Sequence, residues 1–344
     1  MCEGVAIHPQ LLRLGWRDEL PAAAALEGAR GRLARVIEQH RAGYRVSDGL
    51  AEIRALSPPQ WARKGWDPEA RAVVGDWVLL EPTEDRIARL LPRRTLVARA
   101  AAGEHFRRQP IAANIDTVFV VSGLDRDFNP RRLERYLLLV RAAGCEPVIV
   151  LTKRDLCENL GERLQALDPL RGQGVTVTAV DARDPGAREA LAPWLGPGQT
   201  VVLVGSSGAG KSTLTNTLLG LARQKTAAVR AADSRGRHTT THRSLIPLPC
   251  GACLIDTPGM RELKLTGEEE LAEGGFQDIE QLAARCRFRD CRHQAEPGCA
   301  VRQALDAGAL DPARWAQYCK LQDELETTVQ LRGGRRGRRR PQGD

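Results

Sequence analysis

The chain reads Gly205-Ser206-Ser207-Gly208-Ala209-Gly210-Lys211-Ser212-Thr213 beyond its midpoint. This stretch fits G-x-x-x-x-G-K-[ST], the pattern of a phosphate-binding loop. The apolar, β-branched run at 200–204 predicts a buried strand before the loop, and the run at 214–221 predicts a helix after it. The alternative is a Gly/Ser-rich turn before an ordinary helix. The flanking strand and helix favour the phosphate-binding loop.

The residue types in this loop suit the binding of a nucleotide. Glycines let successive backbone N–H groups point at phosphate oxygens, and the helix N-terminus adds partial positive charge. Lys211 is expected to neutralise the β- and γ-phosphates, and the Ser212 hydroxyl to bind Mg²⁺. The predicted nucleotide contacts here are Gly205, Ser206, Ser207, Gly208, Ala209, Gly210, Lys211, Ser212 and Thr213.

The length of 344 residues allows two or three domains, and the composition is that of a globular protein. No apolar run is as long as a membrane span, and the N-terminus lacks the layout of a signal peptide, which predicts a cytoplasmic protein without a membrane partner. Nine cysteines then favour thiols and metal ligands over disulfides. The formal net charge of +8 suits a polyanionic partner such as nucleic acid.

The N-terminal part reads as a short extension followed by a β-rich domain. Residues 1–29 form the extension, with a low-complexity linker at 22–25. From Gly31 apolar and polar residues alternate, which is typical of strands, and turn residues separate the short alternating stretches. Five short strands predict a small barrel, and an OB-fold is the commonest barrel of that size. Its basic residues favour contact with nucleic acid over a role in packing alone. The expected strands are 33–37, 44–46, 51–55, 73–80 and 87–91.

From Gln109 the pattern changes to alternating strands and helices, which predicts a mainly parallel sheet. The expected elements are strands at 116–121, 147–151 and 175–180, a helix at 131–143, and a strand pair at 245–248 and 253–255. A helical segment follows, with a long helix at 311–331. The chain ends in a basic, Gly-rich tail from Arg332, expected to be disordered.

Asp256-Thr257-Pro258-Gly259 follows the last of these strands and gives the D-x-x-G arrangement. Asp256 would hold Mg²⁺ through water, and the Gly259 N–H would meet the γ-phosphate. Such a tetrapeptide alone is usually a turn. Its place downstream of a phosphate-binding loop makes it a nucleotide element.

Thr152-Lys153-Arg154-Asp155 matches the guanine-reading [NT]-K-x-D element. Asp155 would accept two hydrogen bonds from guanine, and Lys153 would lay its aliphatic stem along the base. The alternative is a charged strand-to-helix turn. The element precedes the phosphate-binding loop, whereas ordinary GTPases place it afterwards. Circular permutation explains that order, with the linker at 193–199 joining the original ends.

Four potential metal ligands lie close together: Cys286, Cys291, His293 and Cys299. Four nitrogen and sulfur ligands without an open position suit tetrahedral, structural Zn²⁺. The alternative is a set of reduced surface thiols. Cys250 and Cys253 also read C-x-x-C, but no second pair is near them, so no metal is expected there.

Together, these motifs resemble the ribosome small subunit-dependent GTPase A family, and the resemblance runs from about Gly31 to Leu331. It implies a multi-domain α/β protein with an N-terminal OB-fold β-barrel, a circularly permuted P-loop GTPase domain and a small helical C-terminal zinc domain. The implied division is 1–29, 30–105, 106–266, 267–331 and a tail at 332–344. The implied function is hydrolysis of GTP to GDP, stimulated by the small ribosomal subunit, in late maturation of that subunit. The implied partners are the subunit and its rRNA, and a monomer is expected.

The resemblance also implies roles for residues outside the loop. Where the family often has Ser-Ala in the loop that supports guanine, this chain has Asp181-Ala182. Thr240 matches the residue that completes Mg²⁺ coordination, so Ser212 and Thr240 are the implied magnesium ligands. Many GTPases have Gln directly after D-x-x-G to position the attacking water, but this chain has Met260. His238 is the candidate replacement, and the alternative is a solvated loop histidine. The predicted catalytic residues are therefore His238, Lys211 and Thr240.

Two other functions compete with this one. A nucleotide-dependent small-molecule kinase with an RNA-binding domain would need a lid for the acceptor, and no such segment is recognisable. A pure RNA-binding module would not need Lys211 or Asp256.

Overall fold

The computed structural model describes residues 5, 7–40, 43–63, 65–101, 104–220, 243–256 and 276–336, and the side chains of 100–108 and 328–336 are not described. The described helices are α1 (Gln10–Arg13), α2 (Pro21–Ala24), α3 (Pro130–Ala142), α4 (Leu160–Gln165), α5 (Asp168–Arg171), α6 (Gly186–Leu191), α7 (Lys211–Leu218), α9 (Gln277–Ala283), α10 (Ala300–Asp306) and α11 (Pro312–Arg336). The described strands are β1 (Arg32–His40), β2 (Gly43–Ser47), β3 (Glu52–Ala55), β4 (Trp77–Leu80), β5 (Ile87–Leu90), β6 (Leu96–Ala101), β7 (Glu104–Ala113), β8 (Thr117–Gly123), β9 (Glu146–Thr152), β10 (Thr176–Ala179), β11 (Thr200–Val204), β12 (Arg243–Pro247) and β13 (Cys253–Asp256).

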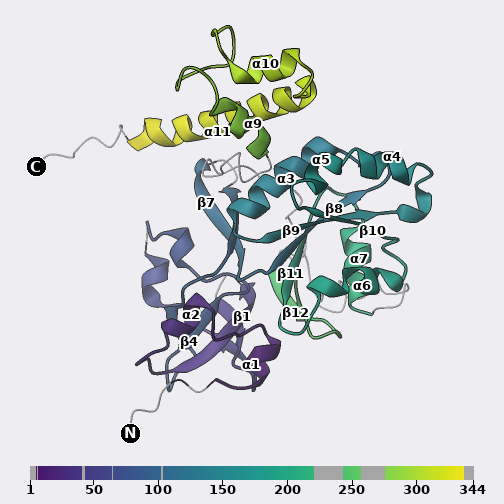
Figure 1. Ribbon diagram of the computed structural model, residues 1–344. Coiled ribbons are helices and arrows are strands. Elements are labelled where there is room, and N and C mark those ends of the chain that lie inside the picture. Colours follow the sequence, from purple (N-terminus) through teal and green to yellow (C-terminus); the bar gives the residue numbers. More distant parts are fainter. Residues whose placement is uncertain are drawn as a thin grey trace, which may run out of the picture.

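Within the described residues, one sheet continues from the α/β part of the molecule into the N-terminal part (Figure 1). Its order is β10-β9-β8-β11-β13-β12-β1-β2-β3, with β4 and β5 attached to β1. Strands β10, β9, β8, β11 and β13 are parallel, whereas β12 pairs antiparallel with β13. All residues of β8 and β11 are buried, as expected of central parallel strands covered on both faces. The sequence therefore predicted the parallel part of this sheet, but not its continuation into the N-terminal strands.

Helices cover both faces of the parallel part. Alternate residues of β8 point to opposite faces, as the pleat requires. Val118 and Val120 pack in one cluster with residues of α3, and Phe119 and Val121 pack in another with residues of α6 and α7. The carboxyl ends of the parallel strands consequently open into loops at one edge of the sheet. Ligands of open α/β sheets bind at that edge.

The five N-terminal strands close on themselves. Strand β1 pairs with both β2 and β4, β3 pairs with β2, and β5 pairs with β4. A parallel bridge between Leu56 and Arg86 joins the chain after β3 to the start of β5 and completes the ring. Val36, Val78 and Leu80 fill the interior. The expected strand at 73–80 begins only at Trp77, because Gly75 has φ +91° and its backbone turns there.

The prediction of a linker at 22–25 is wrong. Residues 21–24 form α2, and Ala22 is buried. Trp16 and Leu11 of the extension also lie against Trp77 and Leu79 of the barrel, with the Trp16 and Trp77 rings edge to face at 4.9 Å. The composition of this stretch gave no periodic signal, and burial against the barrel decides its conformation.

The hairpin β6–β7 was not predicted. Its strands form a separate two-stranded sheet, and Ala112 bridges to Val74 of the barrel. The expected boundary at residue 105 therefore falls inside β7. Alanine and arginine dominate these strands and carry little β-propensity, so the sequence gave no strand signal.

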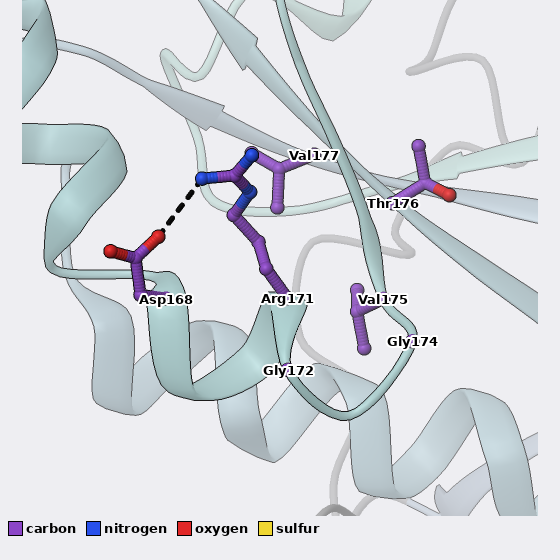
Figure 2. A pocket seen from close by; sticks show the side chains of 7 residues that line it. All are labelled: Asp168, Arg171, Gly172, Gly174, Val175, Thr176 and Val177. Carbon is purple, nitrogen blue, oxygen red and sulfur yellow. Dashed lines mark hydrogen bonds and ion pairs between the residues drawn. The ribbon is translucent and has the colours of Figure 1, made fainter.

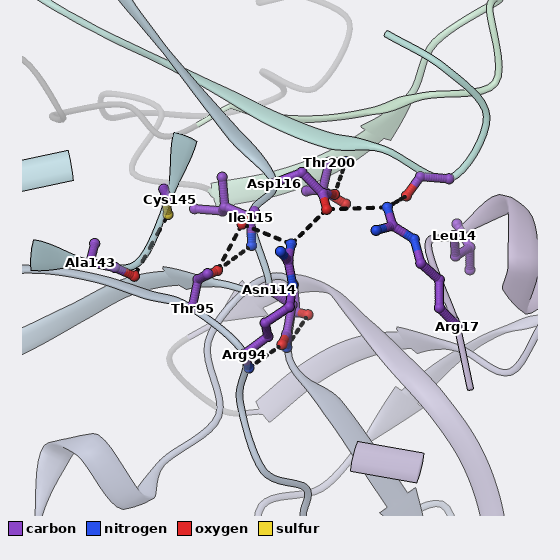
Figure 3. Close-up of polar contacts among 12 residues, drawn as sticks. Leu14, Arg17, Arg94, Thr95, Asn114, Ile115, Asp116, Ala143, Cys145 and Thr200 are labelled. Carbon is purple, nitrogen blue, oxygen red and sulfur yellow. Dashed lines mark hydrogen bonds and ion pairs between the residues drawn. The ribbon is translucent and has the colours of Figure 1, made fainter. Parts of the chain in front are cut away.

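Polar contacts join the barrel, the N-terminal extension and the parallel sheet around Asp116 (Figure 3). Its carboxylate contacts Arg17 at 3.1 Å and Arg94 at 2.6 Å, and accepts the Thr200 N–H at 2.7 Å. Nearby, the buried Arg35 donates to the Thr200 hydroxyl at 3.0 Å and to the Asn114 carbonyl at 3.1 Å. The start of β11, which leads into the phosphate-binding loop, is thus fixed by both neighbouring regions.

The C-terminal helices pack on α3 (Figure 1). Arg314 of α11 contacts Glu134 of α3 at 2.9 Å and Asp278 of α9 at 2.8 Å, and it lies over the Phe276 ring. A second ion pair joins Arg135 of α3 to Glu324 at 2.9 Å. Helix α11 continues to Arg336, so residues 332–336 are helical where a disordered tail was expected. Residues 337–344 lie outside the described part.

Candidate nucleotide site and metal centre

The loop at 205–210 joins β11 to α7, as the sequence predicted. A Cβ atom at Gly205 would lie 2.1 Å from the Val121 carbonyl oxygen, so only glycine fits there. Gly210 has φ +93° and directly precedes α7. The Lys211 Nζ donates to the Gly205 carbonyl at 2.7 Å and to the Ser206 carbonyl at 2.5 Å. Its ammonium therefore lies over the loop, where it can meet an anion bound by the backbone.

The guanine element contacts the phosphate-binding loop. Thr152 ends β9 with its side chain buried, and its hydroxyl donates to the Ala209 carbonyl at 2.6 Å. Lys153 has a left-handed backbone, with φ +60°, and its Nζ contacts Asp125 at 2.6 Å. A non-glycine residue in that conformation costs on the order of 1 kcal/mol, and such positions gather at functional sites. The tertiary structure thus joins two elements that lie 57 residues apart in sequence.

Asp155 and Asp181 lie close to one another through Arg183. The Arg183 guanidinium donates to the Asp155 carboxylate, and its Nε donates to Asp181 at 3.2 Å. The hydrogen bond that Arg183 donates to Asp181 and the negative charge of Asp155 raise the pKa of Arg183. Ala182 is buried, and its carbonyl accepts the Thr217 hydroxyl of α7 at 2.6 Å. The two loops expected to hold guanine therefore meet.

Asp256 ends β13, which pairs directly with β11, so it lies at the same edge of the sheet as the phosphate-binding loop. Other predicted site residues cannot be placed. Gly259, His238, Thr240 and the neighbouring Met260 lie outside the described residues.

Two carboxylates of the β8–α3 turn belong to this region and were missed by the sequence analysis. Asp125 binds Lys153, whose hydrogen bond holds the pKa of Asp125 below its ordinary value. Asp127 accepts the Ser206 hydroxyl at 2.5 Å. The available signal was their position directly after a predicted parallel strand, at the carboxyl edge where the other loops gather.

The four predicted metal ligands are brought together. The three sulfur atoms and a ring nitrogen of Cys286, Cys291, His293 and Cys299 lie within 4.8 Å of one another. The Cys286 and Cys299 sulfurs are 3.9 Å apart, and His293 Nδ1 lies 3.5 Å and 3.4 Å from them. Ideal zinc bond lengths give tetrahedral edges of about 3.8 Å between sulfurs and about 3.6 Å between sulfur and nitrogen. The cluster therefore has the size and donor set to hold a metal ion.

The surrounding chain supports this cluster. Burial opposes ionisation of Cys286, but the Val301 and Ala300 N–H groups at the start of α10 outweigh it and lower the pKa of that thiol. Thiolate is the form that binds metal. The His293 ring lies edge to face with Trp315 of α11, at 5.6 Å between centroids. The cluster thus ties the loop before α10 to the long helix.

A surface depression of about 630 Å³ lies between α5 and β10 and is lined by Asp168, Arg171 and Val177, among others (Figure 2). Its residues lie at the amino end of β10 and before it, whereas Asp181 follows the carboxyl end. The depression is therefore separate from the candidate nucleotide site.

The fold and the site together define a circularly permuted GTPase. The chain resembles the solved structure of "YloQ, a circularly permuted GTPase", with a TM-score of 0.61, 24% identity, and coverage of 87% of this chain and 96% of that one. It also resembles YjeQ from Thermotoga maritima, with a TM-score of 0.62, 24% identity, and coverage of 86% and 98%. The family model described as RsgA GTPase matches residues 90–266. The chain belongs to the RsgA GTPase family, and it is a GTP-hydrolysing enzyme.

Curated relatives agree with this family. The small ribosomal subunit biogenesis GTPase RsgA of Xanthomonas axonopodis pv. citri (strain 306) is 60% identical over 94% of this chain and 90% of its own length. The protein of the same name from Xanthomonas campestris pv. campestris (strain 8004) is 60% identical over 93% of this chain and 90% of its own length.

Proposed function

We propose that this GTPase binds the small ribosomal subunit and its rRNA, assists late maturation of the subunit, and hydrolyses GTP faster when bound to it. The printed names of relatives that cover nearly the whole chain support the ribosomal role. The main structural support for binding of a guanine nucleotide is the hydrogen bond from the Thr152 hydroxyl to the Ala209 carbonyl. This bond holds the guanine element against the phosphate-binding loop.

The proposed nucleotide contacts follow from this arrangement. Residues 205–213 bind the phosphates, and Lys211 neutralises their charge. Asp155 reads guanine, Lys153 packs along the base, and Asp181 and Ala182 support it from the neighbouring loop. The Asp155 carboxylate accepts an N–H of Arg183, and this supports its assignment as the acceptor of the N–H donors that guanine presents.

Mg²⁺ is the metal that supplies charge neutralisation when GTP is bound, and Ser212 and Thr240 are its proposed protein ligands. Asp256 would act on it through water, and Gly259 would contact the γ-phosphate. We assign the positioning of the attacking water to His238, since Met260 has no group that can orient it.

The proposed domains follow the sequence analysis with two boundaries moved: the β6–β7 hairpin connects the barrel to the GTPase domain, and α11 extends the C-terminal module to Arg336. The barrel is assigned as an OB-fold, because its strands close in the order β3-β2-β1-β4-β5 through the Leu56–Arg86 bridge. The metal of the C-terminal module is assigned as one structural Zn²⁺, since three thiolates and an imidazole leave no open position. We expect a cytoplasmic monomer. No described helix is both long enough and apolar enough to span a bilayer.

The test is phosphate release from GTP, measured with and without purified small ribosomal subunits. Slow hydrolysis alone and faster hydrolysis with subunits is the expected result. Large ribosomal subunits and ATP serve as controls for the partner and the base. Equal rates with and without small subunits would contradict the proposed partner, and equal rates on ATP and GTP would contradict the guanine site.

A further inference from the structure

The turn between β8 and α3 contacts the phosphate-binding loop from outside the motif itself. The contact is made by Asp127, whose side chain is 15% exposed. Its Oδ1 accepts the Ser206 hydroxyl at 2.5 Å, and its Oδ2 accepts the Gly123 N–H at 3.2 Å. Ser206 and Asp127 are 79 residues apart in sequence and are brought together by the parallel pairing of β8 with β11.

The carboxylate is itself held in place. Arg132, in the first turn of α3, donates to Asp127 Oδ1 at 2.6 Å and also to the Asp127 carbonyl. Asn129 caps the same helix by accepting the Arg132 N–H at 3.1 Å. Both carboxylate oxygens are therefore engaged, and α3 fixes the group. The Arg132 cation also offsets a negative charge that would otherwise repel a nearby phosphate.

The position of Ser206 matters because its backbone also contacts the lysine of the phosphate-binding loop. Its carbonyl accepts the Lys211 Nζ at 2.5 Å. Asp127 thus fixes the side chain of the residue whose backbone oxygen receives the loop lysine. A loop held in one conformation before the ligand arrives loses less conformational entropy on binding.

We propose that Asp127 is a positioning residue that holds Ser206 and thereby preforms the phosphate-binding loop for nucleotide. It acts through Ser206 and does not touch the nucleotide. Because the bond exists before nucleotide binds, it strengthens binding of GDP and GTP alike and leaves the chemical step unchanged. This inference rests on the proposed assignment of residues 205–213 as the phosphate site.

The test is a double-mutant cycle on the full chain, with GDP and GTP affinities measured by calorimetry. Asp127→Ala and Ser206→Ala should each weaken both nucleotides by about tenfold, because each removes a hydrogen bond to a charged group. The double variant should bind within about twofold of Asp127→Ala, since both changes remove the same bond. Asp127→Asn keeps an oxygen acceptor and should recover part of the affinity. Asp168→Asn, in an exposed surface pair, is the matched control.

Kinetics separate positioning from a general loss of structure. For Asp127→Ala, KM for GTP should rise while kcat stays within about twofold of wild type. Unchanged affinity of Asp127→Ala for GDP and GTP would overturn the proposal, even if the melting temperature of that variant falls. The proposal would also be overturned if the double variant lost affinity by the product of the two single losses. Tighter binding of the Asp127→Ala variant, as relief of charge repulsion would produce, would also overturn it. If that variant does not fold, Asp127→Asn decides in its place, because it keeps the size of the side chain but removes the charge that strengthens the bond to Ser206. Failure of the wild type to bind GDP would instead count against the phosphate site itself.

Discussion

Thr152 shows how a single side chain can replace asparagine at the start of the guanine element. Its hydroxyl has one donor, and that donor meets the Ala209 carbonyl at 2.6 Å in a buried site. A valine at this position would fill a similar volume but leave that carbonyl without its side-chain partner. The residue therefore joins two loops, and the proposed reading of the base falls to Asp155.

At the residue scale, Asp155→Asn should weaken GTP binding by at least about tenfold, because a carboxylate that accepts guanine donors becomes an amide. The same change should admit xanthosine triphosphate, whose base edge offers an acceptor where guanine has its 2-amino group. Affinities for both nucleotides, measured by competition against labelled GDP, provide the check. Asp184→Asn, an exposed neighbour whose carboxylate only caps the Gly186 N–H, should bind as wild type does. If Asp155→Asn still prefers GTP over xanthosine triphosphate as wild type does, Asp155 is not the residue that reads guanine.

His238→Ala should retain GTP binding and subunit binding but lose most of the subunit-stimulated hydrolysis. The reason is that Met260 cannot orient a water, so another group must do so. Single-turnover hydrolysis with saturating small subunits measures this step. His242→Ala, in the same stretch of sequence, is the matched control. Stimulated turnover within about twofold of wild type would show that His238 does not position the water.

At the element scale, α3 connects the two functional regions. Its first turn holds Asp127, and its next residues, Glu134 and Arg135, bind the C-terminal helices. Glu134 and Arg314 are 13% and 12% exposed, so neither charge could be left alone at low cost. The C-terminal module is thus attached to the helix that starts beside the candidate nucleotide site.

Arg314→Ala should lower the melting temperature at pH 7 by about 5 °C, because it leaves Glu134 buried without its cation. Burial already raises the pKa of Glu134, and removing Arg314, which lowers it, should raise this pKa further. The penalty is present only when Glu134 is ionised, so the deficit should shrink as the pH falls from 7 to 5. Arg171→Ala, in an exposed pair with Asp168, should melt within about 1 °C of wild type. If the loss of melting temperature in Arg314→Ala is the same at every pH, the buried charge of Glu134 is not its cause.

Elemental analysis should find about one zinc per chain, because the cluster supplies four ligands at tetrahedral spacing. His293→Ala should reduce the zinc content and the melting temperature, and a strong chelator should reproduce that loss in the wild type. Cys250→Ser should keep the metal, since Cys250 is exposed and outside the cluster. A wild-type protein free of zinc with the same melting profile would contradict the assignment.

At the scale of the whole molecule, the barrel and the α/β sheet are continuous. Strand β1 pairs with β12, placing Glu38 opposite Ser244. Arg35 of β1 donates to Thr200 at the start of β11, and Arg94 holds Asp116, which accepts the Thr200 N–H. The C-terminal helices lie on the far side of α3 from the sheet (Figure 1). Two regions, the barrel and the C-terminal helices, are thus attached to one central α/β domain.

Replacing Arg338, Arg339 and Arg340 with glutamine should weaken binding to small ribosomal subunits and make its salt dependence shallower. Each lost phosphate contact should reduce the slope of log affinity against log salt by about 0.7 to 0.9. Affinities measured over a range of potassium chloride concentrations give that slope. The triple lysine variant keeps the charge and should resemble wild type. An unchanged slope in the glutamine variant would show that these residues do not contact rRNA.

The sequence by itself determined the elements whose signals are short in range. The spacing of Gly205, Gly210 and Lys211, the order of the guanine element before that loop, and the Cys₃His spacing all follow from neighbours along the chain. These patterns predicted the permuted sheet, the barrel strands and the metal cluster, because the relevant residues are constrained by local geometry.

Only the tertiary structure decided the contacts between distant residues. The bonds from Ser206 to Asp127 and from Thr152 to Ala209, and the ion pair from Arg314 to Glu134, depend on which strands and helices become neighbours. The α2 helix and the β6–β7 hairpin likewise form where weak local propensity is overridden by packing. A polar side chain carries no sign of its partner in the sequence, because the partner is chosen by the topology that brings the two together.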